Sequence, residues 1–146
     1  MAKIIVHVTD NSEAYMRALL TEVSNAIDDM GNDLQAVARQ AAPEKTGNLV
    51  KNITVKSSAS SGAYQVDLES TAVDPDTGND YVDRMHNGSY RLGPKSRSKG
   101  IASSRIGNFR KKVGPNYLQG SGELAKAGYQ SYMEKRINAV NMKYGQ

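Results

Sequence analysis

The sequence predicts an α+β fold in a single domain, residues 1–146, in which two helices pack on a small antiparallel β-sheet. Three observations lead to this prediction. Apolar residues recur at spacings of three and four over a long N-terminal stretch, which is the period of a helix. Two later segments alternate apolar and polar side chains, which is the period of a strand. Pro43 and Gly47 stand between the two patterns, where the chain has to reverse.

The composition suits one globular domain with a modest core, since 38% of the 146 residues are hydrophobic. There is no run of 18 apolar residues, so we expect no membrane-spanning segment. The apolar stretch 4–8 is too short for the core of a signal peptide, and we expect a cytosolic protein at synthesis. Because the chain has no cysteine, its stability must come from packing or from assembly with other subunits.

Residues 3–8 are rich in β-branched side chains, and we expect a first strand that pairs with the later ones. A helix should begin near Ser12, because residues 10–12 carry side-chain oxygens that can cap free N–H groups. Glu13 would then lie in the first turn, where a carboxylate suits the positive end of the helix dipole.

This helix carries one continuous apolar stripe, made of Met16, Leu20, Val23, Ile27, Met30, Leu34, Val37 and Ala41. Some 30 residues at about 1.5 Å each span about 45 Å, whereas a compact chain of this size has a radius of gyration of about 15 Å. The helix must therefore protrude, bend or contact a neighbour. A kink at Gly31 and Asn32, which are weak helix formers, and packing against another subunit both remain open.

Residues 42–53 end the helix and lead into a strand. Pro43 lacks an N–H and cannot continue a helix, and Gly47 supplies the conformational freedom for a tight turn. Leu49, Lys51, Ile53 and Val55 would then share one face of a strand over 49–57.

A second strand over 63–70 follows, joined to the first by turn-prone residues 59–62, so the two should form an antiparallel hairpin. One face of this hairpin is apolar and needs the helix as its cover. Residues 81–90 fit either a short strand or a helical turn. Residues 122–144 show helical spacing again and predict a second amphipathic helix.

A strongly basic segment, Ser89 to Asn116, separates the hairpin from the last helix. This basic segment holds eight cations and no acid, whereas the rest of the chain holds 11 cations and 15 acids. Its glycine and proline breakers and its lack of periodicity predict a long irregular loop that would need a partner to become ordered. The eight cations are the candidate contact residues: Arg91, Lys95, Arg97, Lys99, Arg105, Arg110, Lys111 and Lys112.

Three interpretations of the basic segment remain open. It can be a solvated loop, it can bind an acidic protein partner, or it can contact the DNA backbone by counterion release with little sequence readout. The acidic remainder of the chain would also permit self-association through this segment.

Nothing in the sequence predicts catalysis, a metal site or a cofactor. His7 and His86 stand beside no nucleophile motif and no spacing of metal ligands, and we interpret both as structural or surface residues. Residues 74–80 alternate acids as a calcium loop does, but Gly78, Asn79 and Met85 occupy positions where such a loop needs other residues. Residues 93–100 lack the spacing of a phosphate-binding loop.

Residues 41–53 resemble the A-P-x-x-T-G-x-L-x-x-S-I signature of the tail-completion, or head-tail joining, proteins of tailed bacteriophages. Pro43, Thr46, Gly47 and Leu49 match the structural turn of that signature, and Asn52 replaces its usual serine. The resemblance continues in order. Residues 81–89 stand where the family has a tyrosine-rich segment, and residues 115–118 stand where it has a P-F-L motif before a C-terminal helix.

The resemblance implies a structural virion protein without enzymatic activity, which completes the tail or joins it to the head connector. It implies assembly with copies of itself into a ring, expected to be a hexamer, in the neck of the particle after assembly in the host cytoplasm. Its neighbours would be the head connector and the tail-tube or tail-terminator proteins, with DNA contact in the channel as a further expectation. The alternative hypothesis is a small nonspecific nucleic-acid-binding protein that uses the 89–116 segment.

Overall fold

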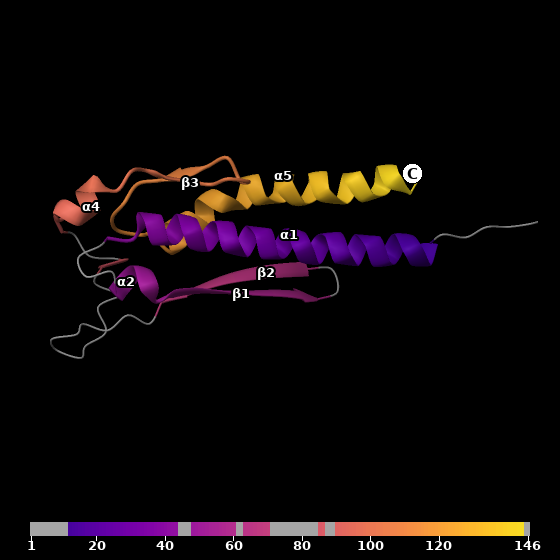
Figure 1. Cartoon of the computed structure of the whole chain (residues 1–146), viewed down its shortest axis with the longest axis horizontal. Coiled ribbons are helices and arrows are strands. Elements are labelled where there is room, and N and C mark those ends of the chain that lie inside the picture. The colour runs from indigo at the N-terminus through magenta and orange to yellow at the C-terminus, as the bar shows by residue number, and fades with distance from the viewer. Residues whose placement is uncertain (1–11, 44–47, 61–62, 71–84, 87–89, 145–146) are drawn as a thin grey trace, which may run out of the picture.

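The computed structural model describes residues 12–43, 48–60, 63–70, 85–86 and 90–144. Three layers lie side by side along the long axis of the molecule (Figure 1). Helix α1 (Ser12–Ala41) lies in the middle, helix α5 (Gln119–Lys143) covers one side, and the hairpin β1 (Ile53–Ser60) and β2 (Ala63–Ser70) covers another. The predicted α+β fold is thus confirmed. No helix in the described part is long and apolar enough to cross a membrane.

Helix α1 has the predicted start and end, and it continues through Gly31 and Asn32 as one helix (Figure 1). The structure gives Gly31 a different role from the kink considered above. A Cβ at this position would lie 2.8 Å from Ser57 Oγ and 3.4 Å from Val55 Cγ2, both on β1. The missing side chain therefore lets the hairpin approach the helix closely.

The chain reverses after α1 through Pro43, which is buried, and through a short helix α2 (Asn48–Lys51). The prediction that the first strand begins at Leu49 was therefore wrong, since β1 begins at Ile53. Leu49 and Ile53 are 3% and 0% exposed and both belong to the core. Leu49 lies in α2 and Ile53 opens β1, and both are buried in the same core cluster. Thr46 and Gly47 of the signature lie outside the described residues.

The predicted antiparallel hairpin is confirmed, with Val55 opposite Leu68 and Ser57 opposite Val66. Val66 and Leu68 pack against the core next to α1, while Gln65 and Glu69 are exposed. The strand expected over 3–8, the acidic loop over 74–80 and most of 81–90 lie outside the described residues.

Two clusters of buried side chains form the core. One cluster surrounds the C-terminal end of α1 and includes Val37, Ala41, Leu49 and Tyr117. The other lies between α1 and α5 and includes Met30, Leu34, Ala125 and Tyr129. The predicted C-terminal helix is thus present, although it begins at Gln119, three residues before the expected start.

Much of the basic segment is irregular, as expected, but it also holds short regular elements. It contains helix α4 (Pro94–Ser98) and a small antiparallel hairpin, β3 (Ala102–Ser103) paired with β4 (Arg110–Lys111). The β3–β4 hairpin packs against α1 and α5, and α4 lies beyond the C-terminal end of α1 (Figure 1). The contacts that order the basic segment join residues far apart in the sequence. No local sequence pattern could therefore predict its structure.

Candidate binding surface

Lys99 ties the basic segment to the C-terminal end of α1. Its Nζ donates to the carbonyl oxygens of Arg39 and Ala42, at 2.9 and 2.7 Å. The last carbonyls of a helix have no partner within the helix and carry partial negative charge, so an ammonium group there satisfies and stabilises them. Two further bonds support the contact, from Gly114 N to Ala41 O and from Gln40 Nε2 to Gly100 O, both at 2.9 Å.

Replacing Lys99 with methionine should lower the free energy of unfolding by about 1–2 kcal/mol, because two charge-assisted bonds and a dipole interaction are lost. Lys95, which is exposed on α4, provides the matched control, and Lys95→Met should change stability by less than about 0.5 kcal/mol. Urea unfolding followed by circular dichroism measures both. Equal stability of the two variants would contradict the capping role.

A second anchor is the carboxylate of Asp33, which is only 8% exposed. It accepts hydrogen bonds from the hydroxyl of Ser104 at 2.6 Å, from the backbone N–H of Arg105 at 2.8 Å and from the hydroxyl of Tyr129 at 2.6 Å. These three donors satisfy a buried charge. Burial, followed by the bond to Asp33, raises the pKa of Tyr129 far above its ordinary value, so its proton stays in place. No local pattern in the sequence distinguishes Asp33 from the other four acids of α1.

The turn after Ser104 lies directly against α5. The N–H of Gly107 donates to Ser104 Oγ at 2.7 Å, and a Cβ built on Gly128 of α5 would lie 1.7 Å from the carbonyl oxygen of Gly107. Only glycine at position 128 permits this contact between a turn and a helix. The basic segment is therefore fixed to α5 as well as to α1.

His86 has a structural position, in agreement with the interpretation from the sequence. Its side chain is buried, and its Nε2 accepts the backbone N–H of Gln119 at 3.1 Å, which satisfies a free amide in the first turn of α5. Its ring packs edge-on against Tyr117, with centroids 5.2 Å apart. Its carbonyl accepts the N–H of Asn116, a residue at φ 61°, at 2.6 Å.

The eight candidate cations divide into two groups. Two of them bind backbone carbonyls of the same chain. Lys99 Nζ donates to the end of α1, and Lys111 Nζ donates to the carbonyls of Lys112 and Pro115 at 3.1 and 3.2 Å. Burial lowers the pKa of Lys111. The other six side chains are exposed, and we call them the basic surface: Arg91, Lys95, Arg97, Arg105, Arg110 and Lys112. The salt bridges found among the described residues involve none of these six.

A charged cluster holds the middle of α1 against α5. Arg136 binds the carboxylates of Glu22 and Asp29, the latter at 2.8 Å, and lies over the ring of Tyr132. The hydroxyl of Tyr132 donates to Asp29 at 2.8 Å. That bond, followed by the bond from Arg136, lowers the pKa of the Asp29 carboxyl below its ordinary range.

Acid should therefore weaken the α1–α5 contact. A carboxyl with a depressed pKa contributes stability that is present above its unfolded pKa of about 4 and is lost as the pH falls through its folded pKa. We expect the melting temperature to fall more steeply between about pH 4 and pH 2 for the native chain than for Asp29→Asn, which has no carboxyl to titrate. Thermal unfolding at a series of pH values measures this. Parallel curves for the two proteins would contradict the role of Asp29.

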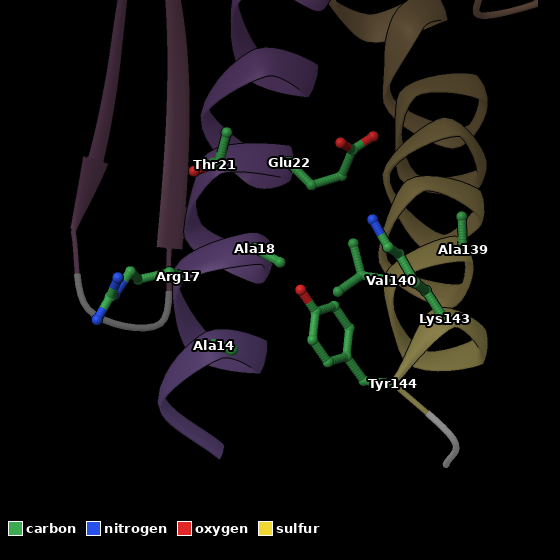
Figure 2. A pocket seen from close by; sticks show the side chains of 9 residues that line it. All are labelled: Ala14, Arg17, Ala18, Thr21, Glu22, Ala139, Val140, Lys143 and Tyr144. Atoms are coloured by element: carbon green, nitrogen blue, oxygen red, sulfur yellow. The ribbon is translucent and has the colours of Figure 1, made fainter. Parts of the chain in front are cut away.

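The described residues form open grooves beside α1. One lies between its first turns and the last turns of α5, has a volume of about 560 Å³ and is lined largely by small side chains. Figure 2 shows Ala18 and Glu22 of α1 pointing toward α5, and Val140 and Tyr144 of α5 pointing toward α1. Another groove, of about 740 Å³, lies between β2 and α5. No group of three or more metal-ligating side chains was found in the described part of the chain.

A family model described as "Bacteriophage HK97-gp10, putative tail-component" matches residues 8–90 of the chain, which is more than half of its 146 residues. The matched range includes α1, the Pro43 to Leu49 corner and both strands of the β1–β2 hairpin. No curated protein and no solved structure matches the chain.

Proposed function

The chain belongs to the HK97-gp10-like family of phage tail components, and from this membership we propose that it is a structural protein of the phage neck that completes the tail or joins it to the head connector. The family match is the observation that carries the proposal. It agrees with the signature at residues 41–53, whose corner joins α1 to the β1–β2 hairpin.

We further propose that the protein works as a ring of identical subunits, a hexamer by the family resemblance. The shape of α1 supports assembly, because 30 residues at about 1.5 Å each extend about 45 Å. Near its N-terminus the apolar stripe remains uncovered in this chain, with Met16 and Leu20 49% and 65% exposed. Exposed apolar surface on an extended helix is typical of a subunit interface.

The basic surface is the part of the protein that we propose to contact a neighbouring ring or the DNA in the channel. Its six cations are held on α4, β4 and the adjoining turns by the anchors at Lys99, Asp33 and Gly128. Ordered cations need less rearrangement to bind than cations on an unfolded loop. Lys99 and Lys111 would support this surface from within, since their ammonium groups bind backbone carbonyls of the same chain.

The test is a phage in which this gene is interrupted. Electron microscopy should show filled heads and tails that remain separate, and the infectious titre should fall by several orders of magnitude and return when the protein is supplied from a plasmid. Normal, joined and infectious particles would overturn the proposal.

The plasmid rescue also tests the basic surface. The triple variant Arg97→Gln, Arg105→Gln, Arg110→Gln should rescue the titre at least about tenfold less well than the native protein, since each lost contact weakens attachment. The matched control carries the same loss of charge at exposed positions outside the basic surface and outside both grooves, Lys51→Gln, Lys56→Gln and Lys135→Gln, and should rescue fully. Equal rescue by the two triple variants would show that the basic surface is not required for the function.

A second candidate is nonspecific nucleic-acid binding by the free protein, favoured by the six exposed cations of the basic surface. It predicts that the isolated chain binds duplex DNA with a steep loss of affinity as salt rises, since bound phosphates release counterions. Fluorescence anisotropy over a salt series measures this. Absence of binding at low salt would rule out nonspecific nucleic-acid binding. The structural role in the phage neck would then remain as the proposed function.

A further inference from the structure

The groove between β2 and α5 is open along one side of the molecule, with a volume of about 740 Å³. Met30 and Leu34 of α1 form its floor, Val66 of β2 lines one wall, and Ala125 and Tyr129 of α5 line the other. Its rim is polar and includes Gln65, Gln119, Glu123, Lys126 and Gln130. An apolar floor between polar rims suits an extended segment with one apolar face.

The free edge of β2 borders this groove. Among the described residues the sheet consists of β1 and β2 alone, so β2 pairs with β1 along one edge and with no strand along the other. Gln65 and Val66 of β2 line the groove, whereas no residue of β1 does. An edge strand presents outward N–H and C=O groups, and these can bind a further strand.

The chain has one segment outside the described residues with the pattern that such a site requires. Residues 3–8 read Lys-Ile-Ile-Val-His-Val. In an extended conformation Ile4, Val6 and Val8 share one face, and this apolar face could cover the floor of the groove. β-branched residues also favour strands, and the chain offers four of them in six positions.

Residues 3–8 are too close to Ser12 in the chain to reach the groove of their own copy. To return along α1, residues 9–11 would have to reverse the chain beside Ser12, after which residues 3–8 would extend only about 20 Å. Met30 and Leu34 lie 18 and 22 residues beyond Ser12, or about 27 and 33 Å along the helix. The groove floor lies beyond the reach of the chain's own N-terminal segment.

We propose that residues 3–8 of one copy bind in the groove of the next copy, as a third strand on the free edge of β2. The contact joins two different surfaces of the same chain, so it is head-to-tail, and such contacts generate a closed ring when the rotation between copies closes. This inference rests on the proposed ring and specifies how neighbouring subunits would hold one another. Main-chain bonds to β2 would supply affinity, and the three inward side chains would set the register.

The absence of cysteine makes disulfide trapping a direct test, because the native chain gives no background. One chain carries Val6→Cys and a second carries Val66→Cys or Gln130→Cys, on either wall of the groove. The matched control for Gln130→Cys is Ser131→Cys, which is also exposed on α5 but does not line the groove. The two chains are mixed at high concentration, oxidised and separated on a denaturing gel. All chains should first show native melting temperatures.

We expect a covalent dimer from Val6→Cys mixed with a groove variant, at least about fivefold more abundant than with Ser131→Cys. A chain that carries both substitutions should give a ladder of covalent oligomers. A doubly substituted chain that links only within one copy would overturn the proposal, as would dimer no more abundant than in the control. If the trapping fails while the interrupted phage still shows unjoined heads and tails, this contact is wrong and the proposed function stands.

Discussion

Replacing Gly128 with alanine should lower the free energy of unfolding by about 3 kcal/mol or more, the largest effect expected of so small a change in this protein. The new Cβ would lie 1.7 Å from Gly107 O and 2.5 Å from Gly107 C. Both atoms belong to the backbone, so no side chain can rotate to make room. The turn that contains Gly107 would have to move away from α5, and with it the bond between Ser104 and Asp33.

The same helix provides the control. A Cβ added at Gly122 would have no atom within 4 Å, and alanine is a better helix former than glycine by up to about 1 kcal/mol. Gly122→Ala should therefore leave stability unchanged or raise it slightly. Urea unfolding of both variants measures the difference. If Gly128→Ala were as stable as Gly122→Ala, the contact between the basic segment and α5 would be refuted.

Replacing Asp33 with alanine should lower the free energy of unfolding by about 3 kcal/mol or more. The change leaves three hydrogen-bond donors inside the protein without their acceptor. Tyr129→Phe removes only one of the three hydrogen bonds and should lower the free energy of unfolding by about 1 kcal/mol. The two changes share a bond, so the double variant should be less destabilised than the sum of the single variants.

Limited trypsin digestion gives this prediction a second measurement. Six of the eight cleavage sites in the basic segment fall from the start of α4 to the end of β4, and Asp33 holds the turn between these two elements. Asp33→Ala should therefore be cut within residues 91–112 much faster than the native chain. An Asp33→Ala protein that unfolds at the same urea concentration as Tyr129→Phe, and is cut no faster, would contradict the anchoring role of this carboxylate.

The elements with strong local patterns could be predicted from the sequence. The stripe from Met16 to Ala41 and the alternation over 63–70 defined α1 and β2 with their observed bounds, because each pattern has a single period. The first strand was predicted to begin too early, because Leu49 and Ile53 satisfy the spacing of a helix as well as that of a strand. In the structure Leu49 lies in α2 and Ile53 in β1, and one core cluster buries both.

The order of the basic segment could not be predicted, because its anchors join residues that are distant in sequence. Ser104 and Asp33 are separated by 71 positions, and Lys99 and Ala42 by 57. The same contacts divide the eight candidate cations, since nothing in a run of basic residues distinguishes Lys99, which binds helix carbonyls, from exposed neighbours such as Arg97. The net charge of a segment indicates a binding surface, but only the fold shows which cations can reach a partner.

The most direct test of the central claim is a cryo-electron microscopy reconstruction of the intact particle at a resolution that distinguishes side chains. We expect a ring of copies of this chain between the head connector and the tail tube, with the basic surface facing a neighbouring protein or the DNA. Helix α1, about 45 Å long, should be its most recognisable feature. A neck fully accounted for by other proteins, or density for this chain elsewhere in the particle, would contradict the account.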